Sequence, residues 1–202
     1  MKRHEFDAFY NLSASAAVWE TIAAEIEFEA SNTRHQSFGA DAVRLTGRYL
    51  WMNDIVGDPV SLSTGFTFSG IFEPVRRNIA SFDHGGIAGE FHVAVGKETS
   101  CEQFWVSRLW GVAAIGIADV GSPWLRGNLH WEHNWWERHQ VEVLFDSIWG
   151  LGGNDLNYPH HFHGYGPINY QAVDGGLRYK YRFNNDAQLT IGYGYRVYAK
   201  NC

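Results

Sequence analysis

The chain has 202 residues, of which 45% are hydrophobic and 16% aromatic, and its formal net charge at pH 7 is -6. The charges are spread along the sequence, which excludes the basic stripe of a nucleic-acid-binding protein. No stretch approaches the roughly 18 consecutive apolar residues of a transmembrane helix, and residues 1–7 lack the apolar core of a signal peptide. We therefore expect a single domain over residues 1–202, without a signal peptide and without a nucleic-acid partner.

Glycine and tryptophan are abundant, with 22 Gly and nine Trp against five Pro. Many glycines and aromatics among short alternating segments are typical of β-barrels and β-sandwiches. The only cysteines, Cys101 and Cys202, are too few for a disulfide framework, so their role stays open.

Alternation of apolar and polar residues predicts β-strands along most of the chain. In chain order the clear segments are 22–28, 43–51, 60–72, 87–95, 104–118, 125–131, 141–149, 177–183 and 189–197. Residues 6–12 alternate briefly and could add one more strand at the start. Segment 22–28 also contains helix formers, but a helix would scatter its glutamates around the surface, which favours a strand. Turn formers and longer loops separate the strands, at 53–59, 73–86, 119–123, 134–139, 150–166 and 184–186.

Regular strands without intervening helices predict sequential antiparallel pairing, that is, a meander. The predicted strands, of 7 to 15 residues, exceed the roughly 5 to 6 residues that are usual in soluble domains. A tilted strand that crosses the hydrocarbon core of a membrane needs about 9 to 11 residues. The strand lengths therefore favour a membrane barrel over a soluble one.

The two faces of the predicted strands differ sharply in chemistry. One face collects aliphatic and aromatic side chains, such as Leu45, Phe66, Phe91, Leu129 and Tyr193. The other collects charges of both signs. A closed barrel of about eight strands has little interior space, and a soluble version would have to bury too many aromatics. We therefore expect the apolar face to meet lipid, and keep a soluble barrel that binds an apolar ligand as the alternative.

In its pattern of alternating strands, turns and aromatic belts, the chain resembles bacterial outer-membrane β-barrel proteins over residues 16–200. This pattern includes the stretches RLWGVAAIGIADVGSPWLRG, HQVEVLF and YRVYAKNC. The resemblance implies a signal peptide, both chain ends in the periplasm, an even strand count and a terminal aromatic residue. Here the clear strands number nine and the last aromatic is Tyr198. Either residues 6–12 supply a tenth strand, or the chain is a piece of a longer protein.

The fold expected is thus all-β, an antiparallel up-and-down (meander) transmembrane β-barrel of about 8 to 10 strands in the bacterial outer membrane. Its charged face should form a lumenal network in which opposite charges compensate one another. The residues proposed for this network are Arg44, Arg48, Glu90, His92, Arg126, Glu132, Glu142, Asp146, Arg178 and Arg182.

Two motifs could carry chemistry, and both are weak. His35 stands two residues before Ser37, which faintly resembles the His-x-Ser-x-Gly stretch of outer-membrane phospholipases. That resemblance implies a Ser37 nucleophile activated by His35, although Phe38 replaces the family's Asn. His160, His161 and His163 could ligate a transition metal, but only Asp155 accompanies them. We expect neither a metal nor another cofactor.

Tryptophans are expected to anchor the strands at the membrane interfaces rather than to stack on carbohydrate. The set comprises Trp51, Trp105, Trp110, Trp124, Trp131, Trp135, Trp136 and Trp149.

The function expected is non-enzymatic: a structural or surface-interaction role for an integral outer-membrane barrel. Membrane lipid is its expected partner, and loops 73–86 and 150–166 are expected to meet surface partners. Three alternatives remain: a narrow pore for small solutes, an acyl hydrolase that uses Ser37 and His35, and the soluble barrel. The sequence leaves the oligomeric state open.

Overall fold

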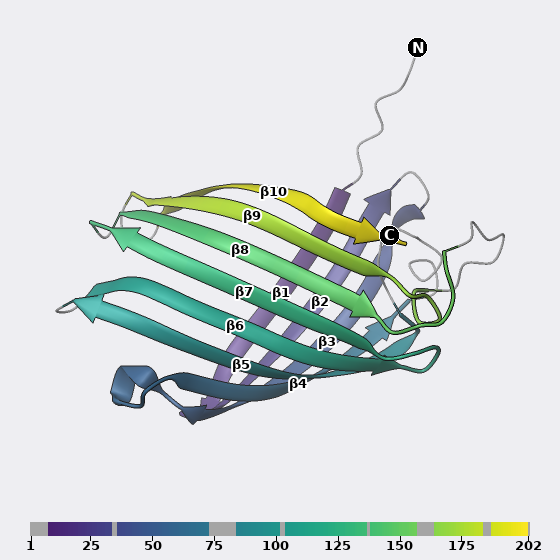
Figure 1. Cartoon of the computed structure of the whole chain (residues 1–202), viewed down its shortest axis with the longest axis horizontal. Coiled ribbons are helices and arrows are strands. Elements are labelled where there is room, and N and C mark those ends of the chain that lie inside the picture. The colour runs from purple at the N-terminus through teal and green to yellow at the C-terminus, as the bar shows by residue number, and fades with distance from the viewer. Residues whose placement is uncertain are drawn as a thin grey trace, which may run out of the picture.

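A computed structural model describes residues 8–33, 36–72, 84–101, 104–136, 138–156, 164–183 and 187–201. Ten β-strands form one antiparallel sheet, in which each strand pairs with the next along the chain (Figure 1). They are β1 (Ala8–Trp19), β2 (Ile22–Thr33), β3 (Gln36–Met52), β4 (Ser61–Ile71), β5 (Ile87–Cys101), β6 (Phe104–Ala118), β7 (Trp124–Trp135), β8 (His139–Gly150), β9 (Gln171–Arg182) and β10 (Gln188–Lys200). The all-β, up-and-down arrangement is confirmed, and the brief N-terminal alternation belongs to a full strand.

The turn between β3 and β4 contains a single turn of 3-10 helix, η1 (Asp54–Val56). The Asn53 side chain accepts a hydrogen bond from the Ile55 backbone N–H, and Gly57 closes the turn at φ 116°, a left-handed conformation that favours glycine. No helix in the described part of the chain is long and apolar enough to cross a membrane.

Strand register assigns each side chain to one of two faces, because directly paired residues point the same way. Phe66 pairs with Phe91, and Leu129 pairs with Phe145; we call this apolar side the outer face. The opposite side, which carries Glu25, Arg48, Glu90, Arg126 and Glu142, is called the inner face. All ten residues of the predicted charged network lie on the inner face.

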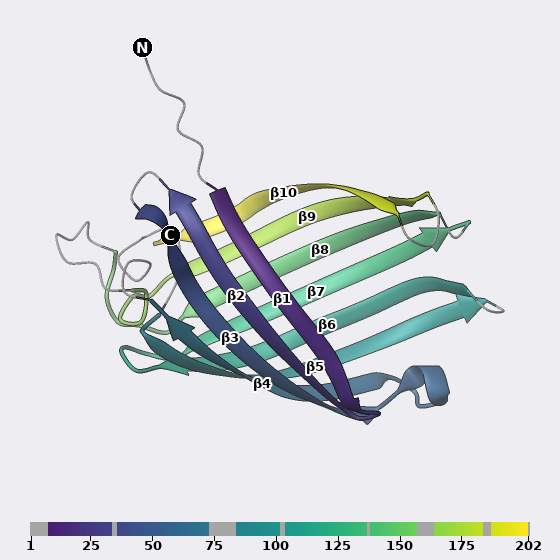
Figure 2. The same cartoon turned by 180° about the vertical axis from the view of Figure 1, so that it is seen from behind.

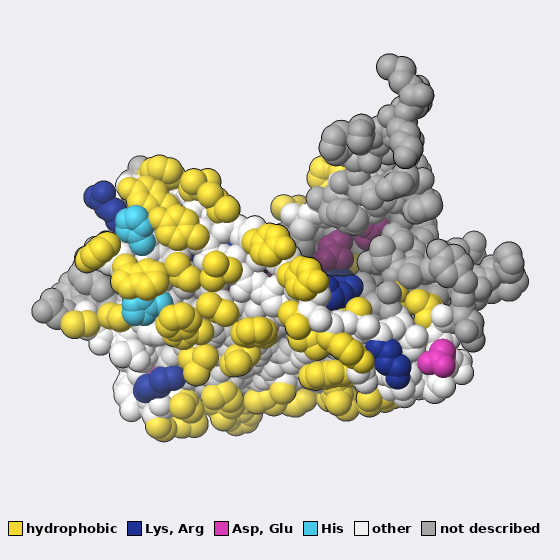
Figure 3. All heavy atoms as spheres, turned by 45° about the horizontal axis from the view of Figure 1, so that its top comes forward, with side chains coloured by type: hydrophobic (Ala, Val, Ile, Leu, Met, Phe, Trp, Pro, Cys, Tyr) yellow, Lys and Arg dark blue, Asp and Glu magenta, His cyan; other side chains and the backbone are white. Residues whose placement is uncertain are grey.

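Exposure distinguishes the two faces. On the outer face Tyr193 is 73% exposed, whereas on the inner face Glu142 is 2% exposed. Hydrophobic side chains spread across the strands on the side seen in Figure 3. The sheet therefore presents its apolar face outward and folds its charged face inward.

The sheet has two free edges, β1 and β10. No pairing joins them, although both strands are described over their whole length. Figures 1 and 2 show β1 running at an angle to β10 rather than alongside it. Every residue of β10 is exposed. The structure thus shows an antiparallel sheet that curls round on itself, with a seam between its first and last strands.

One end of the sheet, where β1 begins and β10 ends, is packed with loop residues; we call it the terminal end, and the opposite end the far end. With ten alternating strands, the connections after β2, β4, β6 and β8 lie at the terminal end. Residues Tyr165, Ile168 and Tyr170 form a buried cluster there, against Ile148 and Leu156. Gly166 accepts a hydrogen bond from the Ser122 backbone N–H at 2.8 Å, so segment 119–123 is joined to this cluster. We call this assembly the cap.

Candidate functional site

Strand β7 carries a row of polar and aromatic side chains along its inner face. Alternation puts every second residue of the strand on this side. From the terminal end to the far end the row reads Trp124, Arg126, Asn128, His130, Glu132 and Asn134. Each of these side chains reaches a partner on another strand or along the row, so β7 is the axis of the inner-face network.

At the terminal end of the row, Glu90 on β5 receives hydrogen bonds from two β7 side chains. The Arg126 guanidinium donates to it through Nε at 3.2 Å and through Nη2 at 2.5 Å. The Trp124 indole N–H donates to Oε2 at 3.2 Å. This carboxylate is therefore held by a cation and a neutral donor at once, the arrangement expected of a compensated buried charge.

In the middle of the row, Arg126 also donates to the Asn128 side-chain oxygen, and the Asn128 amide donates to Asp146 on β8. Asp146 lies 3.5 Å from Nε2 of His130. The other ring nitrogen of His130, Nδ1, is 2.9 Å from Glu142. His130 thus lies between two carboxylates.

Glu142 on β8 collects the densest set of charged neighbours. Besides His130, it is 3.1 Å from Nη1 of Arg178 and 3.2 Å from Nζ of Lys180, both on β9. Its side chain is only 3% exposed. A carboxylate this buried needs such partners, because an isolated charge out of water costs several kcal/mol.

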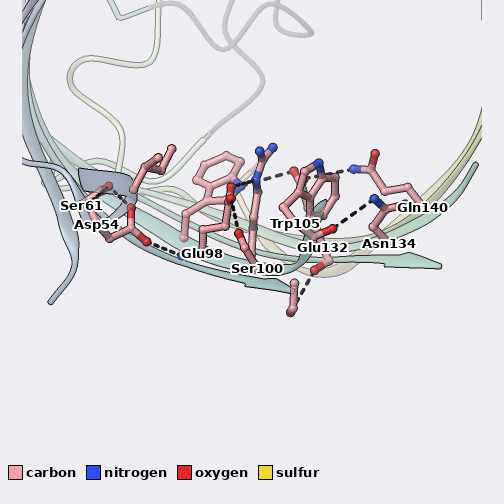
Figure 4. A network of polar contacts seen from close by, with 12 residues as sticks. Asp54, Ser61, Glu98, Ser100, Trp105, Glu132, Asn134 and Gln140 are labelled. Atoms are coloured by element: carbon pink, nitrogen blue, oxygen red, sulfur yellow. Dashed lines mark hydrogen bonds and ion pairs between the residues drawn. The ribbon is translucent and has the colours of Figure 1, made fainter. Parts of the chain in front are cut away.

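Toward the far end, aromatic rings and amides continue the network (Figure 4). The Trp110 ring stacks on His130 with centroids 3.9 Å apart, and its indole N–H points at Glu132 at 3.5 Å. Gln140 donates to the same carboxylate at 3.0 Å. The inner face is therefore filled by side chains at this level.

A second group of charges lies on the inner faces of β2 and β3. Arg44 is 2.5 Å from Glu29 and 3.6 Å from Glu27, and Arg48 is 2.6 Å from Glu25. Except for Glu29, these residues line a cavity of about 370 Å³, which Arg126, Glu90, Thr46, Thr67 and the rings of His84 and Trp124 also border. The cavity is polar and holds both signs of charge.

His84 joins the cap to the sheet. Its ring stacks on Trp124 with centroids 3.8 Å apart, and its Nε2 is hydrogen-bonded to the Tyr170 hydroxyl. Burial lowers the pKa of His84 from 6.5 to about 4, since the charged imidazolium loses its water, and the nearby Glu90 offsets this only in part. His84 is therefore neutral at pH 7.

At the far end, Asp54 ties η1 to the neighbouring strands (Figure 4). Its carboxylate accepts hydrogen bonds from the Ser61 hydroxyl and from the Glu98 backbone N–H, at 2.5 Å for the latter. These two bonds lower the pKa of Asp54 below its usual value. Glu98 in turn pairs with Arg108 at 2.5 Å.

The structure brings together most of the residues predicted for the charged network. Glu90 contacts Arg126, and Glu142 contacts Arg178. His92 is buried against Gly65, and its Nδ1 has no hydrogen-bond partner in the described residues. The Arg182 side chain is exposed at the end of β9.

The side chains of the two candidate chemical motifs are not described by the structure. His35 and the histidines 160, 161 and 163 lie outside the described residues, and Ser37 is described only as part of strand β3. Among the residues that are described, no group of three His, Cys, Asp or Glu side chains could hold a metal ion.

The expectation that the tryptophans anchor at an interface is wrong for Trp110 and Trp124. Both rings lie on the inner face and stack on histidines, and Trp124 is 5% exposed. In the sequence, these tryptophans share strand parity with Arg108 and Arg126, and this pattern indicates a place on the inner face. Sequence reasoning also missed His84 and Tyr170, because their contact joins segments 86 positions apart.

Comparisons of the chain with protein-family profiles, with curated proteins and with solved structures find no match.

Proposed function

We propose that this chain is the wall of a β-barrel embedded in the bacterial outer membrane, with a structural and non-enzymatic role. The observation that carries the proposal is the distribution of side chains between the two faces. Large apolar residues such as Phe91, Leu129 and Tyr193 are exposed on the outer face. Charges on the inner face are partnered, as Glu90, Glu142 and Arg48 illustrate.

The surrounding medium determines whether this distribution is stable. Burial of apolar surface is worth roughly 25 cal/mol per Å², so an outer face of exposed aromatics is unfavourable in water and favourable against acyl chains. Monomeric soluble proteins seldom expose apolar patches beyond a few hundred Å². The strands, of 11 to 17 residues, are long enough to cross a bilayer, which takes roughly 9 to 11.

A structural role fits the interior better than free passage of solutes. Trp110 and His130 stack within the inner face, and His84, Trp124 and Tyr170 pack together at the terminal end. Side chains held by several partners do not clear a path without breaking those contacts. The cap and the row on β7 therefore act as an internal brace.

Contacts with surface partners through loops 73–86 and 150–166 belong to the proposal. The described parts of both loops lie at the terminal end, beside the cap.

The proposal is tested by placing one charge at two depths on the outer face of β5. Val95 lies opposite Gly111, at the middle of β6, and Thr99 lies opposite Ser107, nearer the far end. In lipid vesicles, Val95→Arg should lower the free energy of unfolding by about 2 to 4 kcal/mol, and Thr99→Arg by about 0 to 1. Equal and small effects at both positions would contradict a lipid-facing wall.

A narrow pore is the second candidate, favoured by the charged cavity of about 370 Å³ between β2, β3 and β7. Such a pore should give discrete conductance steps in planar bilayers. Arg44→Glu should change the ion preference of those steps, because a cation lining the path becomes an anion. If intact bilayers show no conductance steps, the pore is rejected and the structural role is the candidate that stands.

A further inference from the structure

The two free edges of the sheet are complete strands. β1 runs over Ala8–Trp19 and β10 over Gln188–Lys200, each 12 or 13 residues long. Within the described part of the chain, no strand pairs with the outward edge of either β1 or β10. Such edges are templates for another strand, and in a membrane each unpaired group would cost several kcal/mol.

β1 and β10 do not close the seam on each other. Paired strands lie about 4.8 Å apart, and β1 and β10 do not lie at that distance. In Figures 1 and 2 they diverge from each other. The two edges are therefore farther apart than one ladder spacing over most of their length.

Strand direction requires an even number of inserted strands, of which two is the smallest. Every neighbouring pair in the sheet is antiparallel, and β1 and β10 run in opposite directions. One inserted strand antiparallel to β10 would run parallel to β1. Two antiparallel strands meet both edges in the pattern of the rest of the sheet, and two such strands joined by a turn are a hairpin.

The side chains at the two edges define the chemistry of that hairpin. The outer face at the seam is apolar, with Leu12, Ile191 and Tyr193 exposed. The inner face at the seam has small, neutral residues, namely Ser13 and Ser15 on β1 and Gly192 on β10. The charge on this face of β10, Arg196, is paired with Asp174 of β9. A matching hairpin has one apolar face and one face of small or uncharged polar residues.

We propose that the seam between β1 and β10 is a docking site for an amphipathic β-hairpin, which adds two strands by edge pairing and completes the barrel. The spacing and the strand directions carry this inference without reference to the medium. Only the apolar outer face of the hairpin rests on the proposed membrane location. If the hairpin does not dock, the proposal of a lipid-facing wall still stands. If the wall does not face lipid, the docking proposal still stands.

The first experiment measures protection of the β10 edge. The probe is a synthetic peptide of residues 8–33, the chain's own β1–β2 hairpin, in which Gln replaces Glu25, Glu27 and Glu29, so that its strands have the required directions and an uncharged inner face. Added to the folded protein in detergent micelles, it should slow amide hydrogen exchange over residues 188–199 about tenfold or more. A scrambled peptide of the same composition should not. Unchanged exchange with the probe would overturn the proposal.

The second experiment measures the width of the seam. In a background with Cys101→Ser and Cys202→Ser, cysteines replace Ser13 on β1 and Gly192 on β10. Two inserted strands set the edges about 14 Å apart, three ladder spacings, so a bismaleimide of that reach should join the cysteines within one chain, whereas oxidation should not. A disulfide within one chain would show self-closure, and one between two chains would show that a second copy fills the seam. Either result overturns the proposal.

Discussion

Glu142 is the residue on which the inner-face network depends most. It is nearly buried and contacts groups on two strands, His130 on β7 and the cations Arg178 and Lys180 on β9. Without its negative charge, the two cations of β9 would face each other uncompensated.

Glu142→Gln should therefore lower the free energy of unfolding by about 3 to 5 kcal/mol, the usual cost of breaking a buried ion pair. Asp174→Asn is the matched control. It breaks the pair between Arg196 and Asp174, whose side chains are 43% and 39% exposed, so it should cost about 0 to 1 kcal/mol. Urea titration in lipid vesicles measures both, and equal losses would contradict the role given to Glu142.

His84 predicts a pH dependence of the cap. Its folded-state pKa, about 4, lies below the ordinary 6.5, so the unfolded chain binds the proton more tightly. The contribution of the neutral ring is complete above about pH 6.5 and declines as the pH falls toward 4, by roughly 3 kcal/mol in all.

Unfolding midpoints at pH 7.5 and pH 4.5 measure this effect. The midpoint of the parent protein should drop at the lower pH, and His84→Gln should remove most of the difference, because glutamine does not titrate. An unchanged pH dependence in the variant would assign the titration to another group.

At the scale of the strands, glycines allow large rings to lie across the inner face. A Cβ on Gly116 would come within 2.0 Å of the Trp124 ring, whereas a Cβ on Gly47 would meet nothing within 4 Å. Gly116→Val should cost about 1 to 3 kcal/mol through overpacking.

Gly47→Val is the control for that substitution and should be neutral or stabilising, since valine favours strands. Near-ultraviolet circular dichroism, which reports the packing of Trp124, should change for Gly116→Val alone. A near-ultraviolet spectrum like that of the parent protein in both variants would show that Trp124 does not pack as described.

The strands could be predicted from sequence because period-two alternation is a local property. Apolar residues from Leu177 to Phe183 alternate with Arg178, Lys180 and Arg182, and residues 177–182 are indeed part of β9. Parity also assigned the charged residues to one face. The cap could not be predicted, because His84, Trp124 and Tyr170 meet only through tertiary structure. Aromatic composition alone predicts an interfacial position for Trp110 and Trp124, whereas their parity, shared with Arg108 and Arg126, places them on the inner face.

At the scale of the whole molecule, the topology separates two ends. One holds the chain ends and the cap, and the other holds the short turns and η1. Between them lies a wall that is apolar outside and charged inside. The hairpin-filled seam would make that wall continuous.

The central claim is that this wall meets lipid, and folding of the purified chain with and without a bilayer tests it most directly. Unfolded protein diluted from urea into phospholipid vesicles should gain β-structure, resist added protease and migrate differently on gels when unheated and heated. Dilution into buffer alone should give aggregation. A soluble, monomeric, protease-resistant protein without detergent or lipid would contradict the account.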